Sequence, residues 1–359
     1  MSEHAPYTSF RPGREWLDTN GNRIHVHGGS LLHEDGTYYW YGENKEHSTP
    51  GSGIWTYGVR CYSSSDLYNW QDRGLIIPPA LDDPSSPLHP SRFIDRPHIV
   101  RDPRTGAYVC WLKIMGEGDE QLCTILTAAA LLGPYEIVRT GFRPLGMNAG
   151  DFDLVVDPDD GRGRYFFERV HSELICADLI DDLTDVTGEF STHFPRSHPP
   201  HVREAPAYFR RGDKHYLITS GTSWYYPNPS ETAVADSYHG PYTVLGSPHP
   251  TEETSTSFRS QISSIFRHPT EADLYIAVAD RWLPHLSEQE SDRTVDFHRH
   301  YGAEAAGAIA PALDLPEADT SRADHVWLPL RFEGERPVID WHEEWRWEDL
   351  AKSGTGEGS

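Results

Sequence analysis

Basic residues are few in this sequence, with 31 Lys and Arg against 55 Asp and Glu and a formal net charge of −24. A chain with this balance repels a phosphate backbone unless it has a local basic patch. No such patch is visible, so we expect no nucleic-acid partner. No stretch approaches the roughly 18 consecutive apolar residues needed to cross a bilayer, so we also expect no membrane segment.

Cysteine is also scarce, and no CxxC pair is present. The four cysteines are isolated in apolar, strand-like runs, so we expect buried free thiols and no disulfide framework or metal site: Cys61, Cys110, Cys123 and Cys176. The N-terminal sequence MSEHAPYTSFRPGREW has no basic region followed by an apolar one. We therefore expect a cytoplasmic protein, or a secreted one if a leader has been removed.

Aromatic residues are plentiful, at 12% of the chain with 11 Trp and 18 Tyr. Disordered chains lack this content, so most of the length is expected to fold. Helical periodicity is scarce. What recurs is a short apolar strand, a Gly/Asp turn and a second strand rich in Tyr, Trp and Val. Five such hairpins are predicted, at residues 28–43, 96–113, 151–169, 205–221 and 260–282.

The hairpins repeat at intervals of roughly 50–70 residues, a period suited to a propeller blade. A further strand pair follows each one, at residues 59–74, 122–138, 172–186, 231–246 and 326–341. Four strands per unit and five units predict an all-β, five-bladed β-propeller that forms a single domain over residues 1–350. A β-sandwich or a pair of smaller β domains fits five matched units less well.

Three segments do not follow the repeat. We expect residues 16–29 to form a strand, turn and strand that supply an outer strand closing the ring. Residues 283–325 are predicted to be an insertion within the fifth blade, containing a short helix ended by Pro311. Residues 351–359 are predicted to be a disordered tail.

The first strand of each propeller blade lines the central axis, so polar residues at its start converge on one funnel. These positions hold, blade by blade, His25 and His27, Asp95 and Arg96, Asp151 and Asp153, Arg203 and Glu204, and Ser260 and Gln261. Carboxylates from three blades therefore meet, and their repulsion raises the pKa of at least one, which suits a general acid. These acids could instead cap turns or pair with arginines. Three acids at equivalent positions favour catalysis.

Aromatic residues in loops after the inner strands could stack against the apolar face of a sugar, or could equally pack between blades: Trp224, Tyr225, Tyr226 and Trp282. The 20 histidines lack an acidic ligand shell where they cluster, so no metal site is predicted. No phosphate-binding glycine loop or nucleophile motif is present, and no cofactor is predicted.

Several blocks of sequence together resemble glycoside hydrolase family 43, specifically its exo-β-1,3-galactanase-like branch. They run in order from about residue 24 to 345: HVHGGSLLHEDGTYYWYGENKE, YSSSDLYNW, EAPAYFRRGDKHYLITSGTSWYYPNP, SFRSQISSIF, ADRW and VWLPLRFEGERPVIDWHEEW. The resemblance implies a five-bladed propeller that hydrolyses glycosidic bonds with inversion.

The resemblance also implies roles for individual residues. Glu204 in REAPAYF matches the general acid, and Asp151 in AGDFDLVVD matches the carboxylate that tunes its pKa. Most of the family has an Asp base on the first blade, where this chain has His27, Gly28 and Gly29. In the galactanase-like branch a fifth-blade Gln in an imidic acid form is thought to replace that base, and it matches Gln261.

The remaining site residues are expected to bind substrate. Asp95 stands where the branch usually has Glu, and His98 where it usually has Lys. His27 is a competing candidate for the base, since a neutral imidazole accepts protons near pH 7. The full substrate-binding set comprises Asp95, His27, Arg96, Trp224, Tyr225, Asp280 and Trp282.

The predicted function is that of an inverting exo-glycoside hydrolase acting on an oligo- or polysaccharide. Its expected product is galactose, released from β-1,3-galactan or related plant oligosaccharides. The alternatives are a β-xylosidase or α-L-arabinofuranosidase of the same fold, and a non-catalytic sugar-binding propeller.

Overall fold

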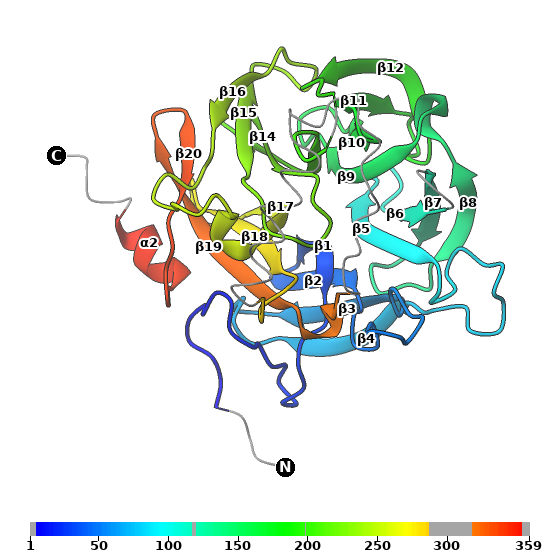
Figure 1. Ribbon diagram of the computed structural model, residues 1–359, viewed down its shortest axis with the longest axis horizontal. Coiled ribbons are helices and arrows are strands. Elements are labelled where there is room, and N and C mark those ends of the chain that lie inside the picture. Colours follow the sequence, from blue (N-terminus) through cyan, green and yellow to red (C-terminus); the bar gives the residue numbers. More distant parts are fainter. Residues whose placement is uncertain (1–4, 117–119, 198, 287–317, 354–359) are drawn as a thin grey trace.

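The computed structural model describes residues 5–116, 120–197, 199–286 and 318–353. These residues form five antiparallel sheets of four strands each, arranged as blades around a central axis (Figure 1). The predicted five-bladed β-propeller is confirmed. Among the described helices, none is long and apolar enough to span a membrane.

Each blade is built from four strands that are consecutive in the chain. Blade one holds β1 (His27–Glu34), β2 (Thr37–Glu43), β3 (Val59–Ser64) and β4 (Gln71–Ile77). Blade two holds β5 (Phe93–Arg101), β6 (Tyr108–Met115), β7 (Gln121–Ala128) and β8 (Glu136–Phe142). Blade three holds β9 (Ala149–Val156), β10 (Gly163–Arg169), β11 (Glu173–Leu179) and β12 (Val186–His193).

The last two blades follow the same order. Blade four holds β13 (Arg203–Arg211), β14 (Lys214–Gly221), β15 (Glu231–Ala235) and β16 (Thr243–Gly246). Blade five holds β17 (Gln261–Arg267), β18 (Tyr275–Arg281), β19 (Asp324–Glu333) and β20 (Arg336–Ile339). Short 3-10 helices lie between strands: η1 (Pro144–Gly146), η2 (Ser257–Arg259) and η4 (Thr320–Arg322). The one described α-helix is α2 (Trp347–Ser353).

The hairpin turns explain why these strands form. In the turn between β1 and β2, Asp35 has φ +48° and Gly36 has φ +78°. Two central residues with positive φ are typical of the type I′ turn, whose twist matches that of the flanking strands. The Asp-Gly pair is a sequence signal of that turn, which is how the hairpin could be predicted.

The hydrophobic core is divided into five clusters, each lying between two adjacent blades. Neighbouring inner strands contact one another around the whole ring, from β1 through β5, β9, β13 and β17 back to β1. Side chains on both faces of the inner strands are therefore mostly buried, whereas outer strands such as β8 are mostly exposed. The four cysteines are buried free thiols within these clusters and their surroundings, as predicted.

The ring does not close as expected. Residues 16–29 supply no outer strand, because the outermost strand of blade five is β20 and comes from the C-terminal part of the chain. Residues 17 and 23 instead form an isolated bridge. A short backbone pairing of Phe10 with Trp345 links the segment before blade one to the segment after blade five, with N–O distances of 2.8 and 3.1 Å. These two rings stack 4.3 Å apart and join the core between blades one and five.

The chain end also differs from its prediction. Helix α2 runs to Ser353, so residues 351–353 are helical rather than part of a disordered tail. The helix is held because Trp347 stacks on His268 at 4.6 Å and Glu348 accepts a hydrogen bond from Tyr68. Residues 354–359 lie outside the described residues.

The expected insertion over residues 283–325 connects β18 to β19. Its residues 287–317, including the helix expected before Pro311, lie outside the described residues. The end of the segment enters β19, which begins at Asp324.

We predict that Trp345→Ala will lower the free energy of unfolding by about 3–5 kcal/mol, the usual range for truncating a buried Trp. The substitution removes the stacking on Phe10 and the hydrogen bond from Trp345 Nε1 to the Trp327 carbonyl. Denaturant unfolding followed by circular dichroism measures the change. The matched control is Trp224→Ala, since Trp224 is 63% exposed and should cost little. Equal effects of the two variants would contradict the structural role of Trp345.

Candidate active site

The inner strands begin at a cavity of about 330 Å³ that receives residues from every blade. Polar and charged side chains line it together with several aromatic rings. The lining residues used below are Glu43, Trp55, Asp95, Arg96, Lys113, Asp151, Glu168, Glu204, Trp224, Tyr225, Gln261 and Trp282.

Most of the residues predicted from the sequence lie in this cavity. The three expected catalytic residues, Glu204, Asp151 and Gln261, line it together. So do five of the expected substrate-binding residues, which are Asp95, Arg96, Trp224, Tyr225 and Trp282. The other two, His27 and Asp280, do not line it. Asp280 instead borders a small adjoining space beside Trp282.

Backbone irregularities aim these side chains. Strand pairing shifts register where the inner strands enter the cavity, between His27 and Ser30, between Asp95 and His98, and between Glu204 and Ala207. Within these three interruptions Gly28, Arg96 and Ala205 adopt φ of +60°, +53° and +47°. A bulge with a left-handed residue bends the strand and redirects its side chains, and it is a common feature beside active sites.

Two cations hold Asp151 ionised at the base of the cavity. Lys113 Nζ lies 2.7 Å from Asp151 Oδ1, and Arg96 Nη2 lies 3.0 Å from Asp151 Oδ2. Burial alone would raise the pKa of Asp151, but Arg96 and Lys113 outweigh it and lower the pKa to about 2. Lys113 also lies 3.3 Å from Asp95 Oδ2, so one cation links two of the predicted carboxylates.

Glu204 has the opposite electrostatics. Burial raises its pKa well above the usual range, and the negative charges of Asp151 and Glu168 raise it further. Glu204 therefore holds its proton to higher pH than an ordinary Glu, whereas Asp151 is ionised. When the environment drives the pKa values of two neighbouring carboxyl groups apart, the group with the raised pKa can serve as the acid, which here is Glu204.

Gln261 is held by four polar contacts. Its Oε1 accepts hydrogen bonds from Arg96 Nη2 at 2.8 Å and from Trp282 Nε1 at 3.0 Å. Its Nε2 donates to Ser220 Oγ at 2.9 Å and to Glu204 Oε1 at 3.4 Å. Arginine and tryptophan side chains can only donate, so the Gln261 oxygen that faces both of them accepts from both.

Aromatic side chains form a continuous wall on one side. The rings of Trp55 and Tyr225 lie 5.7 Å apart, and those of Tyr225 and Trp282 lie 4.9 Å apart. Trp224 is 63% exposed and has φ +54° at the cavity mouth. A wall of aromatic faces beside clustered polar groups suits a sugar, which has both apolar faces and hydroxyl edges.

The sequence analysis considered only inner strands and the loops after them, so it missed several lining residues, of which four bear on the charges and the aromatic wall described above. Glu43 and Lys113 lie at the ends of the second strands β2 and β6, Glu168 lies near the end of β10, and Trp55 lies in the loop after β2. A second strand runs antiparallel to its inner strand, so its end reaches the cavity beside the start of that inner strand. Pairing of His27 with Glu43 and of Asp95 with Lys113 shows this. Antiparallel pairing was therefore the signal that could have found them.

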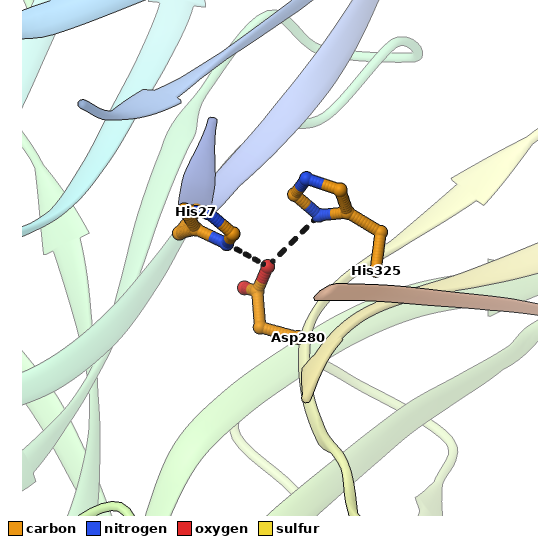
Figure 2. Close-up of side chains that lie close together, drawn as sticks. All are labelled: His27, Asp280 and His325. Atoms are coloured by element: carbon orange, nitrogen blue, oxygen red, sulfur yellow. Dashed lines mark hydrogen bonds and ion pairs between the residues drawn. The ribbon is translucent and has the colours of Figure 1, made fainter. Parts of the chain in front are cut away.

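His27 belongs to a buried cluster with Asp280 and His325 (Figure 2). Its ring lies 5.6 Å from that of Trp282, which lines the cavity. Asp280 Oδ1 accepts from Nδ1 of His27 at 2.9 Å and of His325 at 3.2 Å, and Oδ2 accepts from Gly28 N–H at 2.8 Å. Burial and the neighbouring His325 lower the pKa of His27 to about 4, so it is neutral. This position does not support His27 as a substrate ligand or as the base.

The same three side chains place possible metal-ligand atoms within 4.8 Å of one another. Imidazoles that bind a metal usually donate their other ring N–H to an acceptor. Here Nε2 of both His27 and His325 is buried without a hydrogen-bond partner. The geometry instead fits two Nδ1–H donors on one carboxylate, which joins blade one to blade five.

Comparison with curated proteins gives no match to this chain. Solved structures with the same fold include two family-43 β-1,3-galactosidases. The first is 26% identical with a TM-score of 0.78, and the match covers 96% of this chain and 65% of that one. The second, solved with galactodeoxynojirimycin, is 25% identical with a TM-score of 0.75, and the match covers 94% and 100%. An exo-β-1,3-galactanase from Clostridium thermocellum is 25% identical with a TM-score of 0.71, covering 94% and 66%.

This chain thus spans about two thirds of the length of the first and third of these proteins and the whole of the second. The sequence profile of glycosyl hydrolases family 43 matches residues 25–301, which is more than half of the chain. That match and the five-bladed fold show that the chain belongs to glycosyl hydrolases family 43 and is a glycoside hydrolase.

Proposed function

We propose that this protein is an exo-acting, inverting hydrolase that releases galactose from β-1,3-linked galactan or related oligosaccharides. The observation that carries the proposal is the pair formed by Glu204 and Asp151. Both residues line the same cavity, and a carboxyl with a raised pKa beside an ionised carboxylate suits a general acid.

In this mechanism Glu204 protonates the oxygen of the departing sugar. Asp151 keeps the proton on Glu204 by its negative charge, while Arg96 and Lys113 keep Asp151 ionised. Protonation matters most when the leaving group is a sugar alkoxide, because that group is a poor leaving group without a proton.

The choice of substrate rests on the cavity and on the relatives. A cavity of about 330 Å³ suits the end of a sugar chain better than its middle, which favours exo action. The aromatic wall of Trp55, Tyr225 and Trp282 offers stacking surfaces for that sugar. The structural relatives at 25–26% identity are described as β-1,3-galactosidases and an exo-β-1,3-galactanase.

The direct test is hydrolysis of β-1,3-galactobiose and β-1,3-galactan, followed by proton NMR. Inversion predicts α-galactose as the first product from a β-linkage. Aryl β-xyloside and aryl α-L-arabinofuranoside are run beside them, and faster turnover of either would transfer the proposal to that sugar. Binding of galactobiose without any turnover would replace it with a sugar-binding propeller.

We predict that Glu204→Gln will reduce kcat on β-1,3-galactobiose by about 10²–10⁴-fold, since the variant has no proton to give to the leaving oxygen. The loss should be smaller on an aryl galactoside, whose leaving group needs less protonation. Steady-state kinetics on both substrates measures this difference. Full activity of the variant on galactobiose would refute the role of Glu204 as the acid.

We predict that Asp151→Asn will move the alkaline limb of the kcat/KM profile to lower pH. The acid is active only when protonated, and removing the neighbouring charge lowers its pKa, so activity is lost earlier as pH rises. Glu168→Gln is the matched control and should cause a smaller shift in the same direction, because its charge acts on Glu204 more weakly. An unchanged alkaline limb in Asp151→Asn would limit that residue to a structural role.

A further inference from the structure

Trp224 differs from the other residues that line the cavity. It is exposed, whereas each of the other described lining residues is buried or half-buried. Its neighbour Tyr225 packs between Trp55 and Trp282, but the indole of Trp224 has no ring contact among the described residues. A single exposed apolar side chain is common in proteins, so the backbone conformation of Trp224 is the more informative feature.

That conformation is one that a bulky residue rarely adopts. Trp224 has φ +54° and is the first central residue of a turn closed by a hydrogen bond from Tyr226 N–H to the Ser223 carbonyl at 3.0 Å. Turns with positive φ at this position favour glycine, asparagine or aspartate. A tryptophan there costs free energy, and residues held in such strained conformations are concentrated at active sites and ligand contacts.

Hydrogen bonds between buried groups hold the turn in this conformation. Ser223 Oγ donates to the Tyr226 carbonyl at 2.7 Å, and Asn228 Nδ2 donates to Ser223 Oγ at 2.7 Å. Asn228 Oδ1 also accepts from Gly221 N–H at 2.7 Å, which ties the turn to the end of β14. The exposed indole is therefore carried by a loop with a fixed backbone, so little conformational freedom is lost when it binds a ligand.

The turn belongs to the same blade as the acid. Strand β14 pairs with β13, and Glu204 lies opposite Ser220, four residues before Trp224. The side chains that would hold the first sugar, such as Asp95 and Asp151, are buried. The rest of a sugar chain must therefore extend toward the exposed side of the cavity, where Trp224 lies. The leaving sugar also has to be on the side of Glu204, because that residue protonates the leaving oxygen.

We propose that Trp224 is a stacking platform for the leaving sugar, the residue joined to the terminal galactose by the bond that is cleaved. This inference rests on the proposed function and adds the group that recognises the second sugar. A flat indole packs against the apolar C–H face of a pyranose. The contact is made before and during bond cleavage alike, so it lowers KM more than it raises kcat. The enzyme thereby prefers galactose joined to another sugar over galactose joined to a small group.

The experiment compares two substrates that differ in the leaving group. In β-1,3-galactobiose a sugar departs, whereas in β-galactosyl fluoride only fluoride departs. Steady-state kinetics on both are measured for the wild type, Trp224→Ala, Trp224→Gly and Trp224→Phe, together with thermal unfolding. The matched control is Phe93→Ala, because Phe93 is also exposed and its ring lies 4.7 Å from that of Trp55, yet it does not line the cavity.

We expect kcat/KM on galactobiose to fall about 3–10-fold in Trp224→Ala and Trp224→Gly, mainly through KM, which is the scale of one aromatic stacking contact. Trp224→Phe keeps an aromatic face and should retain most of the wild-type value. Turnover of galactosyl fluoride should change much less in all three variants, and Phe93→Ala should match the wild type on both substrates. Trp224→Gly should not lower Tm, since glycine adopts φ +54° without strain.

Three results would overturn the platform and leave the proposed function intact. They are equal losses on the two substrates, a wild-type kcat/KM on galactobiose in folded Trp224→Ala, and an equal loss in Phe93→Ala. The first would assign Trp224 to the terminal galactose or to the stability of the fold, and Tm distinguishes these two roles. A wild-type protein that hydrolyses neither substrate would overturn both the proposed function and this inference.

Discussion

Asp151 lies between Lys113 and Arg96, and the charges of the cavity depend on this contact. Without the two cations burial would raise the pKa of Asp151. Burial raises the pKa of Glu204, and the charge of an ionised Asp151 raises it further. The same cations also contact other lining residues, since Lys113 forms an ion pair with Asp95 and Arg96 donates a hydrogen bond to Gln261. One buried ion cluster thereby sets the protonation of the acid and the orientation of the groups around it.

The propeller makes such a cluster possible because its members come from different sheets. Asp151 belongs to blade three, Arg96 and Lys113 to blade two, Glu204 to blade four and Gln261 to blade five. Each sheet is anchored by an interblade core, so like charges can be held close together without moving apart. The pairing of Phe10 with Trp345 links the segment before blade one to the segment after blade five.

Much of the fold could be predicted from the sequence, because each blade repeats the same pattern of an apolar strand, a turn with Gly or Asp, and an aromatic-rich strand. The alternation around Asp35 and Gly36 is one such signal. The pairing of Phe10 with Trp345 could not be predicted, since the two residues are more than 300 positions apart and show no strand pattern of their own. The placement of Glu204 and Asp151 in one cavity could be predicted, because both residues stand near the starts of inner strands.

Site prediction was incomplete where local backbone geometry decides the outcome. His27 is at the start of an inner strand, yet the bulge at Gly28 leaves its imidazole buried and bonded to Asp280. Glu43 shows the reverse case, because it comes from a second strand and reaches the cavity through the gap that Gly28 leaves. Because position 28 is a glycine, it supplies no carboxyl of its own and leaves room for the carboxyl of Glu43. The chemistry of the first blade depends on backbone conformation as well as on residue identity at that position.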